Sequence, residues 1–315
     1  LRRKSSDISV LPQTSGDDIG DTLSFRVDYR PPFNWECFLR FLGARAIPGV
    51  EAVREGVYLR TVEIGDHVGW IAVTSYRVSK RVRPVNALKV TLSDTLQPVC
   101  VQVLSRVKSV FDTRANAGEI DLHLAADPLL RDSVAAHAGM RLPGAFDGFE
   151  LLLRAILGQQ VSVKGATTLA GRMAKVFGKS ILTPWDELTH LSPDVGRIAE
   201  APVSTIAQIG MPGKRAETIR LVAGAVHAGD LVLAPGADPD VISEQLIAFP
   251  GIGEWTASYV AMRALAWPDA LPLGDLGIKK ALGLTRKAAI LERTETWRPW
   301  RAYAAIYLWL SLSGG

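Results

Sequence analysis

Two short segments of the sequence carry residue types and spacings that fit chemistry on a phosphate-bearing substrate. In the first, Gly251 and Gly253 lie between two helical patterns, where glycine permits a tight turn that side chains would obstruct. The following helix begins at once, so its first N–H groups face outward and favour an anion. In the second, Asp275 adds one carboxylate, twenty residues after Trp255. A turn that can bind phosphate beside a single carboxylate predicts chemistry on a nucleic acid. An ordinary structural turn explains the glycines equally well.

Asp275 lies in a turn that precedes a short helical pattern, and two roles fit it. Aspartate is favoured as the N-cap of a helix, which is its ordinary structural role. A cap position also fixes the side chain, and the positive end of the helix dipole keeps the carboxylate ionised. The two roles are compatible, because one residue can both start a helix and hold a negative charge against a substrate.

The elements that must position these residues divide the chain into two parts. After a linker or tail at residues 1–21, residues 22–95 mix strand patterns with one helix that Asn34 caps. Residues 96–315 favour a helical body, which contains the glycine hairpin at 240–265. The predicted fold class is therefore α+β: a small mixed α/β N-terminal domain followed by an all-helical body with a central cleft.

Hydrophobic periodicity predicts the individual elements. Strands are expected at 23–29, 57–64, 70–78 and 87–92. Pro212-Gly213 and Asp238-Pro239 are expected to start two of the helices. The basic run from Arg77 to Arg83 fits either phosphate contacts or solvated edge-strand charges, and the second is favoured because charged edges guard against strand pairing. Helices are expected at 97–111, 128–138, 147–158, 162–177, 203–209, 213–228, 238–249, 254–266, 275–283 and 299–312.

Composition excludes several classes of protein. The 315 residues are 48% hydrophobic and 22% charged, which suits a chain with a substantial core. The net charge of +4 fits a nucleic-acid partner and also an ordinary basic enzyme. The two cysteines, Cys37 and Cys100, and the five scattered histidines give no spacing for a zinc or iron–sulfur site. The sequence has two thiols, no signal peptide and no apolar run long enough to cross a bilayer. These features predict a cytoplasmic protein that does not span a membrane.

The hairpin and its surroundings resemble the helix-hairpin-helix DNA glycosylase superfamily, and within it the alkylation-repair family of 3-methyladenine DNA glycosylase II. The resemblance covers residues 23–312, in order, which makes it far more specific than one motif. Besides the hairpin and the loop with Asp275, the segments that carry it are Tyr29–Trp35, Phe41–Ala46, Arg141–Gly144, Arg154–Val163, Gly210–Ala216, Asp269–Lys279 and Trp297–Tyr303.

The resemblance implies hydrolysis of the N-glycosidic bond of alkylated, cationic bases such as 3-methyladenine in duplex DNA. It assigns Asp275 as the catalytic residue, and it places Trp255, Tyr259 and Trp309 around a base that is flipped out of the helix. Aromatic faces attract a cation, whereas the ordinary role of each ring is core packing. Relatives that also cut the strand have a Schiff-base lysine where Trp255 stands, so we expect a monofunctional enzyme that leaves an abasic site.

The family pattern also implies contacts to the DNA and to an ion. The expected contacts to the DNA backbone are Gly251, Gly253, Glu254 and Thr256. The wedge that fills the gap left by the flipped base is expected at Gln160, where the family usually has an apolar residue; a surface turn is the alternative. No cofactor is required, but the hairpin can hold a structural Na⁺ or K⁺ on the backbone carbonyls of Ile247, Phe249 and Ile252.

The expected partner is double-stranded DNA with damaged bases, bound by a monomer in base excision repair. The basic start of the chain and its first residue, Leu1, suggest an upstream fusion to an alkyl-transfer regulatory domain. Two alternatives remain. The first is a glycosylase for other lesions, such as hypoxanthine, uracil or oxidised guanine. The second is a helix-hairpin-helix module that binds DNA without catalysis, against which Asp275 and the aromatic set argue.

Overall fold

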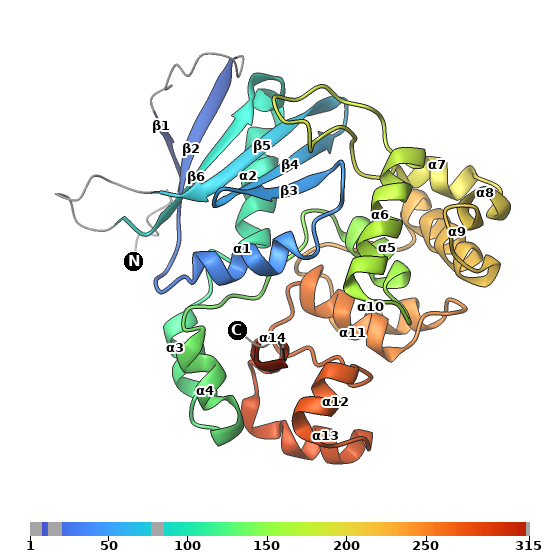
Figure 1. Cartoon of the computed structure of the whole chain (residues 1–315). Helices are drawn as coiled ribbons and strands as arrows, with labels where there is room; N and C mark the ends of the chain where they lie inside the picture. Colours follow the sequence, from blue (N-terminus) through green and yellow to red (C-terminus); the bar gives the residue numbers. More distant parts are fainter. Residues whose placement is uncertain (1–7, 12–20, 77–84, 313–315) are drawn as a thin grey trace.

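The computed structural model describes residues 8–11, 21–76 and 85–312. Within these residues a sheet with flanking helices is followed by a helical body (Figure 1), so the predicted fold class is confirmed. The basic run from Arg77 to Arg83 lies outside the described residues. Among the helices of the described ranges, none has the length and apolar character that crossing a bilayer requires.

The N-terminal part is built on one six-stranded antiparallel sheet with the strand order β1-β2-β6-β5-β4-β3. The four predicted strands are present, although β5 begins at His67 rather than at position 70, and β1 and β3 are additional. The strands span Ile8–Leu11 (β1), Thr22–Asp28 (β2), Glu51–Arg54 (β3), Val57–Ile64 (β4), His67–Ser75 (β5) and Ala87–Ser93 (β6).

Strand β1 lies inside the segment 1–21, where we expected a linker or tail, and here the structure differs from the expectation. Its backbone pairs antiparallel with β2, from Ile8 opposite Val27 to Leu11 opposite Ser24. The sequence Ile-Ser-Val-Leu has the β-branched and apolar residues that strands favour. The edge of β2 offers unpaired backbone groups, so pairing overrides the polar composition of the surrounding segment.

The sheet is covered on both faces. Tyr58 and Ile71 face the main core, together with α1 (Trp35–Gly43) and α2 (Cys100–Val110), while their neighbours Leu59 and Trp70 point to the opposite face. There they pack with residues 185 and 188 of a loop from the helical body, and the rings of Trp70 and Trp185 lie 4.7 Å apart. Asn34 accepts the N–H of Cys37 at 3.2 Å, which confirms the predicted cap of α1.

The helical body surrounds α5 (Gly148–Leu157), whose apolar side chains are buried on every side. It contacts α6, α9 and α11. Asp238 caps α10 and Pro239 follows in its first turn, as predicted. The other helices span Ala117–Leu124 (α3), Pro128–Ala136 (α4), Val163–Phe177 (α6), Val195–Glu200 (α7), Val203–Ala207 (α8), Gly213–Ala228 (α9), Pro239–Ile247 (α10), Glu254–Arg263 (α11), Leu276–Leu282 (α12), Lys287–Arg293 (α13) and Arg301–Leu312 (α14).

The last helix, α14, forms the centre of the C-terminal group of helices and lies near α11 and α12 in Figure 1. All of its residues from position 301 to position 308 are buried. Arg301 forms a bidentate pair with Asp269, at 2.7 and 2.8 Å, and this fixes the loop before α12 against the start of α14. This pair therefore connects the loop between α11 and α12 to the first residue of α14.

Asp127 joins α4 to α13 through a set of short bonds, and it generates our first prediction. It caps α4 through the N–H of Leu129 and accepts bonds from Arg293 at 2.5 and 2.7 Å and from Trp297 at 2.6 Å. Hydrogen bonds from Arg293 are the main cause that lowers its pKa from 3.8 to about 2. We expect Asp127→Asn to lower the free energy of unfolding at neutral pH by about 1–3 kcal/mol.

The pH dependence of this contribution follows from the sign of the shift. Because the pKa is lower in the folded protein, the stabilisation is complete above the ordinary value of 3.8 and is lost as the pH falls toward about 2. Urea denaturation of wild type and variant across this range measures the difference. Asp132→Asn, at an exposed position of the same helix, is the matched control and should change little. Equal losses in both variants would contradict the prediction.

Candidate active site

The hairpin between α10 and α11 is a tight turn that needs glycine. Gly251 has φ 85°, and a side chain there would bring its Cβ to 2.7 Å from the Thr218 hydroxyl. The Thr218 hydroxyl donates to the carbonyl of Pro250 at 2.6 Å, which holds the turn on α9. Gly253 has open space around its Cα and is exposed. The outer surface of the turn is therefore bare backbone that a ligand can approach closely.

Helix α11 begins at this turn without a side-chain cap. Its first N–H groups, at Glu254, Trp255 and Thr256, have no partner within the helix by the geometry of a helix start. The Glu254 carboxylate is held by Lys287 at 2.7 and 2.9 Å, which offsets its charge near an incoming phosphate. The Thr256 side chain is buried, so this residue can meet an outside group only through its backbone.

Asp275 is the point where three helices meet. It caps α12 by accepting the N–H of Ile278 on Oδ1 at 2.9 Å. The indole N–H of Trp309, on α14, also donates to Oδ1 at 2.9 Å, and the indole N–H of Trp255, on α11, donates to Oδ2 at 3.0 Å. Asp275 is half-buried. A carboxylate oxygen accepts about two bonds, so the remaining acceptor capacity lies on Oδ2, beside Trp255.

The predicted aromatic residues lie around this carboxylate. The rings of Trp255 and Tyr259 stack with centroids 5.4 Å apart and an angle of 12°, because they are four residues apart on α11. Tyr259 and Trp309 are 6.3 Å apart at 47°. Tyr259 is buried, whereas both tryptophans are half-buried. The structure thus brings together all four side chains predicted for the catalytic and base-binding roles, and the roles themselves stay predictions.

The predicted wedge lies in the turn between α5 and α6, next to the hairpin. Gln160 is exposed and has φ 57°, an uncommon conformation for a residue with a side chain. The side chain of its neighbour Gln159 is hydrogen-bonded to the hairpin. Its amide donates to the carbonyl of Gly251 at 3.0 Å and to the Thr256 hydroxyl at 3.1 Å. Arg215 donates to the carbonyl of Gln159 at 2.7 Å. The turn is therefore fixed to the hairpin.

The carbonyls predicted to bind a cation come from the end of α10 and the hairpin. The Phe249 carbonyl accepts the N–H of Ile252 at 3.1 Å, and Ile247 is the last residue of α10. Among the described residues no group of three or more His, Cys, Asp or Glu side chains could hold a metal ion. The bound cation stays a prediction.

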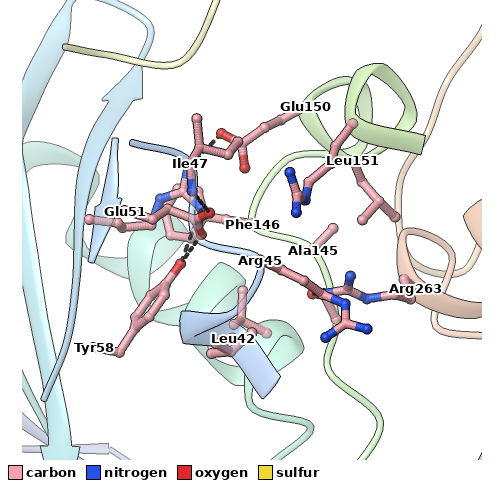
Figure 2. A pocket seen from close by; sticks show the side chains of 14 residues that line it. Leu42, Arg45, Ile47, Glu51, Tyr58, Ala145, Phe146, Glu150, Leu151 and Arg263 are labelled. Atoms are coloured by element: carbon pink, nitrogen blue, oxygen red, sulfur yellow. Dashed lines mark hydrogen bonds and ion pairs between the residues drawn. The ribbon is translucent and has the colours of Figure 1, made fainter. Parts of the chain in front are cut away.

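A pocket that the sequence did not predict lies between residues of the N-terminal part and residues of the helical body (Figure 2). Asp275 and the three aromatic residues do not line it. Four arginines line it, and they come from segments far apart in the sequence: Arg45, Arg60, Arg154 and Arg263. One signal was available, because Arg263 follows Tyr259 by four residues and therefore shares its helical face.

Comparisons with known proteins agree with this architecture. The AlkA N-terminal domain model matches residues 24–147, and the model of the HhH-GPD superfamily base excision DNA repair protein matches residues 153–296. DNA-3-methyladenine glycosylase 2 of Escherichia coli is 34% identical over 285 residues, which cover 90% of this chain and 96% of that protein. The probable bifunctional transcriptional activator/DNA repair enzyme AlkA of Mycobacterium tuberculosis is 35% identical over 92% of this chain, and the chain spans 57% of its length.

Two solved structures show the same fold. The 3-methyladenine DNA-glycosylase from Archaeoglobus fulgidus has a TM-score of 0.76 and 21% identity, and the match covers 90% of this chain and 97% of that one. The 8-oxoguanine glycosylase/lyase of Clostridium acetobutylicum in its apo-form has a TM-score of 0.69 and 19% identity, with coverages of 97% and 98%. At these identities the likeness concerns the fold alone.

The bonds of Gln159 generate a prediction about the turn that carries Gln160. Replacing Gln159 by Ala removes the two hydrogen bonds that its side-chain amide donates to Gly251 and Thr256. We therefore expect the free energy of unfolding to fall by about 1–2 kcal/mol. We also expect faster amide exchange in residues 158–162 and 250–254. Urea denaturation and hydrogen exchange measure the two effects. The adjacent and exposed Gln160→Ala is the control and should leave both nearly unchanged; a similar response of the two variants would count against the proposed link.

Proposed function

The chain belongs to the HhH-GPD superfamily of base excision DNA repair proteins, in the family of DNA-3-methyladenine glycosylase 2, and we propose that it hydrolyses the N-glycosidic bond of alkylated bases in duplex DNA. Cationic bases such as 3-methyladenine are the expected substrates, and the product is an abasic site. The observation that supports this most strongly is Asp275, held by two indole N–H groups beside a helix start that can bind phosphate.

Asp275 supplies the negative charge that the reaction needs. As the glycosidic bond lengthens, positive charge develops on the deoxyribose ring, and a fixed carboxylate stabilises charge that exists mainly in the transition state. Its three hydrogen bonds fix the carboxylate before substrate arrives. Oδ2, which keeps acceptor capacity, is the oxygen placed to orient or deprotonate the attacking water.

The aromatic side chains of Trp255, Tyr259 and Trp309 select a base through its positive charge. A cation over an aromatic face is stabilised by about 0.5–2 kcal/mol, with the upper end in a desolvated site. Trp255 and Trp309 are half-buried, and the indole N–H of each bonds to the carboxylate. Such a pocket binds alkylated purines through their positive charge, so its specificity is broad. Trp255 occupies the position of the Schiff-base lysine in strand-cutting relatives, which supports a monofunctional reaction.

The hairpin and the neighbouring turn are proposed to hold the DNA. The bare backbone at Gly251 and Gly253 and the N–H groups that begin α11 bind a phosphate without reading sequence. Gln160 projects from the adjacent turn and fills the gap in the base stack, although an amide intercalates less well than an apolar side chain. A Na⁺ or K⁺ on the carbonyls of Ile247, Phe249 and Ile252 would reinforce the hairpin, and the Phe249 oxygen keeps one acceptor position for it.

The biological setting is proposed from the same evidence. The partner is double-stranded DNA with damaged bases, bound by a monomer in the bacterial cytoplasm. We also propose a fused upstream alkyl-transfer regulatory domain; the name of the M. tuberculosis relative, which combines a transcriptional activator with a DNA repair enzyme, supports the regulatory fusion and does not mention alkyl transfer.

The role of Asp275 is tested by replacing it with Asn. The asparagine oxygen can keep the bonds from Ile278 and Trp309, whereas its NH2 group cannot accept the N–H of Trp255, so the urea midpoint of the variant is measured alongside its activity. The lost charge should lower the single-turnover excision rate by about 10²–10³-fold. Release of 3-methyladenine from methylated duplex DNA measures the rate, and fluorescence anisotropy with an abasic-analogue duplex measures binding, which we expect within about threefold of wild type. Near-normal turnover would remove Asp275 from the mechanism.

The cation preference is tested at Trp309. Trp309→Ala should lower excision of cationic 3-methyladenine about 2- to 30-fold more than excision of neutral hypoxanthine, which is the range of a cation–π contact. Because Trp309 also bonds to Asp275, Trp309→Phe is the control: it loses the N–H and keeps an aromatic face. The phenylalanine variant should therefore retain the preference. Equal losses on both lesions in the alanine variant would argue against a cation–π pocket.

A further inference from the structure

Two glycines lie on either side of Asp275, and the backbone conformation explains neither of them. Gly274 comes directly before the carboxylate, and Gly277 is the second residue of α12. Neither has the positive φ that residues with a side chain avoid. Glycine also weakens a helix relative to alanine, so Gly277 is an unfavourable residue for the start of α12. A different reason for the two glycines lies in their surroundings.

Gly277 leaves room for the bond between Trp309 and Asp275. A Cβ at position 277 would lie 3.0 Å from Oδ1 of Asp275 and 3.2 Å from Cδ1 of the Trp309 ring. Contacts this short require one of these side chains to move by a few tenths of an ångström. The same two groups form the 2.9 Å hydrogen bond from the indole N–H to Oδ1. A side chain at position 277 would therefore displace one partner of that bond.

Gly274 has the corresponding position beside Trp255. A Cβ at position 274 would lie 3.2 Å from the Cβ of Trp255. That atom does not move when the side chain rotates, so the strain would pass to the distance between the loop and α11. Trp255 donates its indole N–H to Oδ2 of Asp275 at 3.0 Å. This bond therefore depends on the close approach of the loop to α11 at a residue without a side chain.

The third bond of Asp275 does not depend on the glycines. The N–H of Ile278 reaches Oδ1 at 2.9 Å in the ordinary geometry of an N-cap, which needs no glycine nearby. The cap bond fixes Asp275 to its own helix, whereas the two indole bonds fix the carboxylate relative to α11 and α14. The bonds that orient the carboxylate within the site are thus the ones that require the glycines.

We propose that Gly274 and Gly277 are positioning residues for the reaction: their missing side chains let two indole N–H groups reach the carboxylate of Asp275 directly. This inference rests on the proposed glycosylase function. Two bonds from rigid rings hold the carboxylate in one orientation before substrate binds, which a reaction that relies on a fixed charge requires. The glycines act through Asp275 and its two donors rather than on the substrate itself.

Gly277→Ala tests the inference with the smallest side chain. Displacement of the carboxylate or the indole should lower the single-turnover release of 3-methyladenine about 3- to 30-fold. Binding of an abasic-analogue duplex should stay within about threefold of wild type, because the hairpin is unchanged. The urea midpoint should not fall, because the higher helix propensity of alanine offsets the strain. Gly224→Ala in α9, where a Cβ would meet nothing within 4 Å, is the matched control and should leave the rate unchanged.

Double variants separate positioning from a general structural effect. Trp309→Phe removes the indole N–H, so adding Gly277→Ala has no bond left to weaken and should lower the rate less than about twofold further. Gly274→Ala should lower the rate about 3- to 30-fold alone, and less than about twofold further when it is added to Trp255→Phe. A merely structural role would give the full loss in every background.

The outcomes distinguish this inference from the proposed function. No release of 3-methyladenine by wild type overturns both. A normal rate in Gly277→Ala or in Gly274→Ala, or losses that add in full in the double variants, overturns the inference and leaves the proposed function standing. Urea midpoints identify a variant that has lost its fold. If Gly277→Ala fails to fold, the variants at Gly274 decide the question, because that residue is exposed and lies outside a helix.

Discussion

The carboxylate of Asp275 is the constraint on which the arrangement of the C-terminal helices depends. A half-buried charge is stable only when hydrogen bonds replace the water that it loses. Here those bonds come from three different helices: the N–H of Ile278 in α12, the indole of Trp255 in α11 and the indole of Trp309 in α14. The three helices must therefore keep one relative position, and that position is also the one that leaves an oxygen of Asp275 available beside two aromatic faces.

Strong and remote contacts maintain this position. The bidentate pair of Asp269 and Arg301 fixes the loop that leads to Asp275, and the fully buried first two turns of α14 fix the helix that carries Trp309. On the other side, Gln159 joins the turn after α5 to the hairpin before α11. Elements that would act on the sugar, the base and the backbone phosphate are thus parts of one connected set of bonds, as a reaction that depends on positioning requires.

The parts of this site that sequence could predict are those with local signals. The hairpin glycines, the cap role of Asp275 and the shared face of Trp255 and Tyr259 each follow from spacings of a few residues, and the family resemblance added Trp309. The pocket lined by Arg45, Arg154 and Arg263 could not be predicted, because these residues come together only after α1, α5 and α11 have packed. Strand β1 was missed for a similar reason, since its pairing partner is outside its own segment. The domain boundary at 95 stays a prediction.

The proposed base pocket favours positive charge on the side of Asp275. There a carboxylate and the faces of Trp255 and Trp309 favour a positive base and a positive sugar. When the glycosidic bond breaks, positive charge develops on the sugar, so the carboxylate meets charge that exists mainly in the transition state. The arrangement is therefore complementary to the transition state on the sugar side, and a cationic base gains in addition the attraction of the aromatic faces.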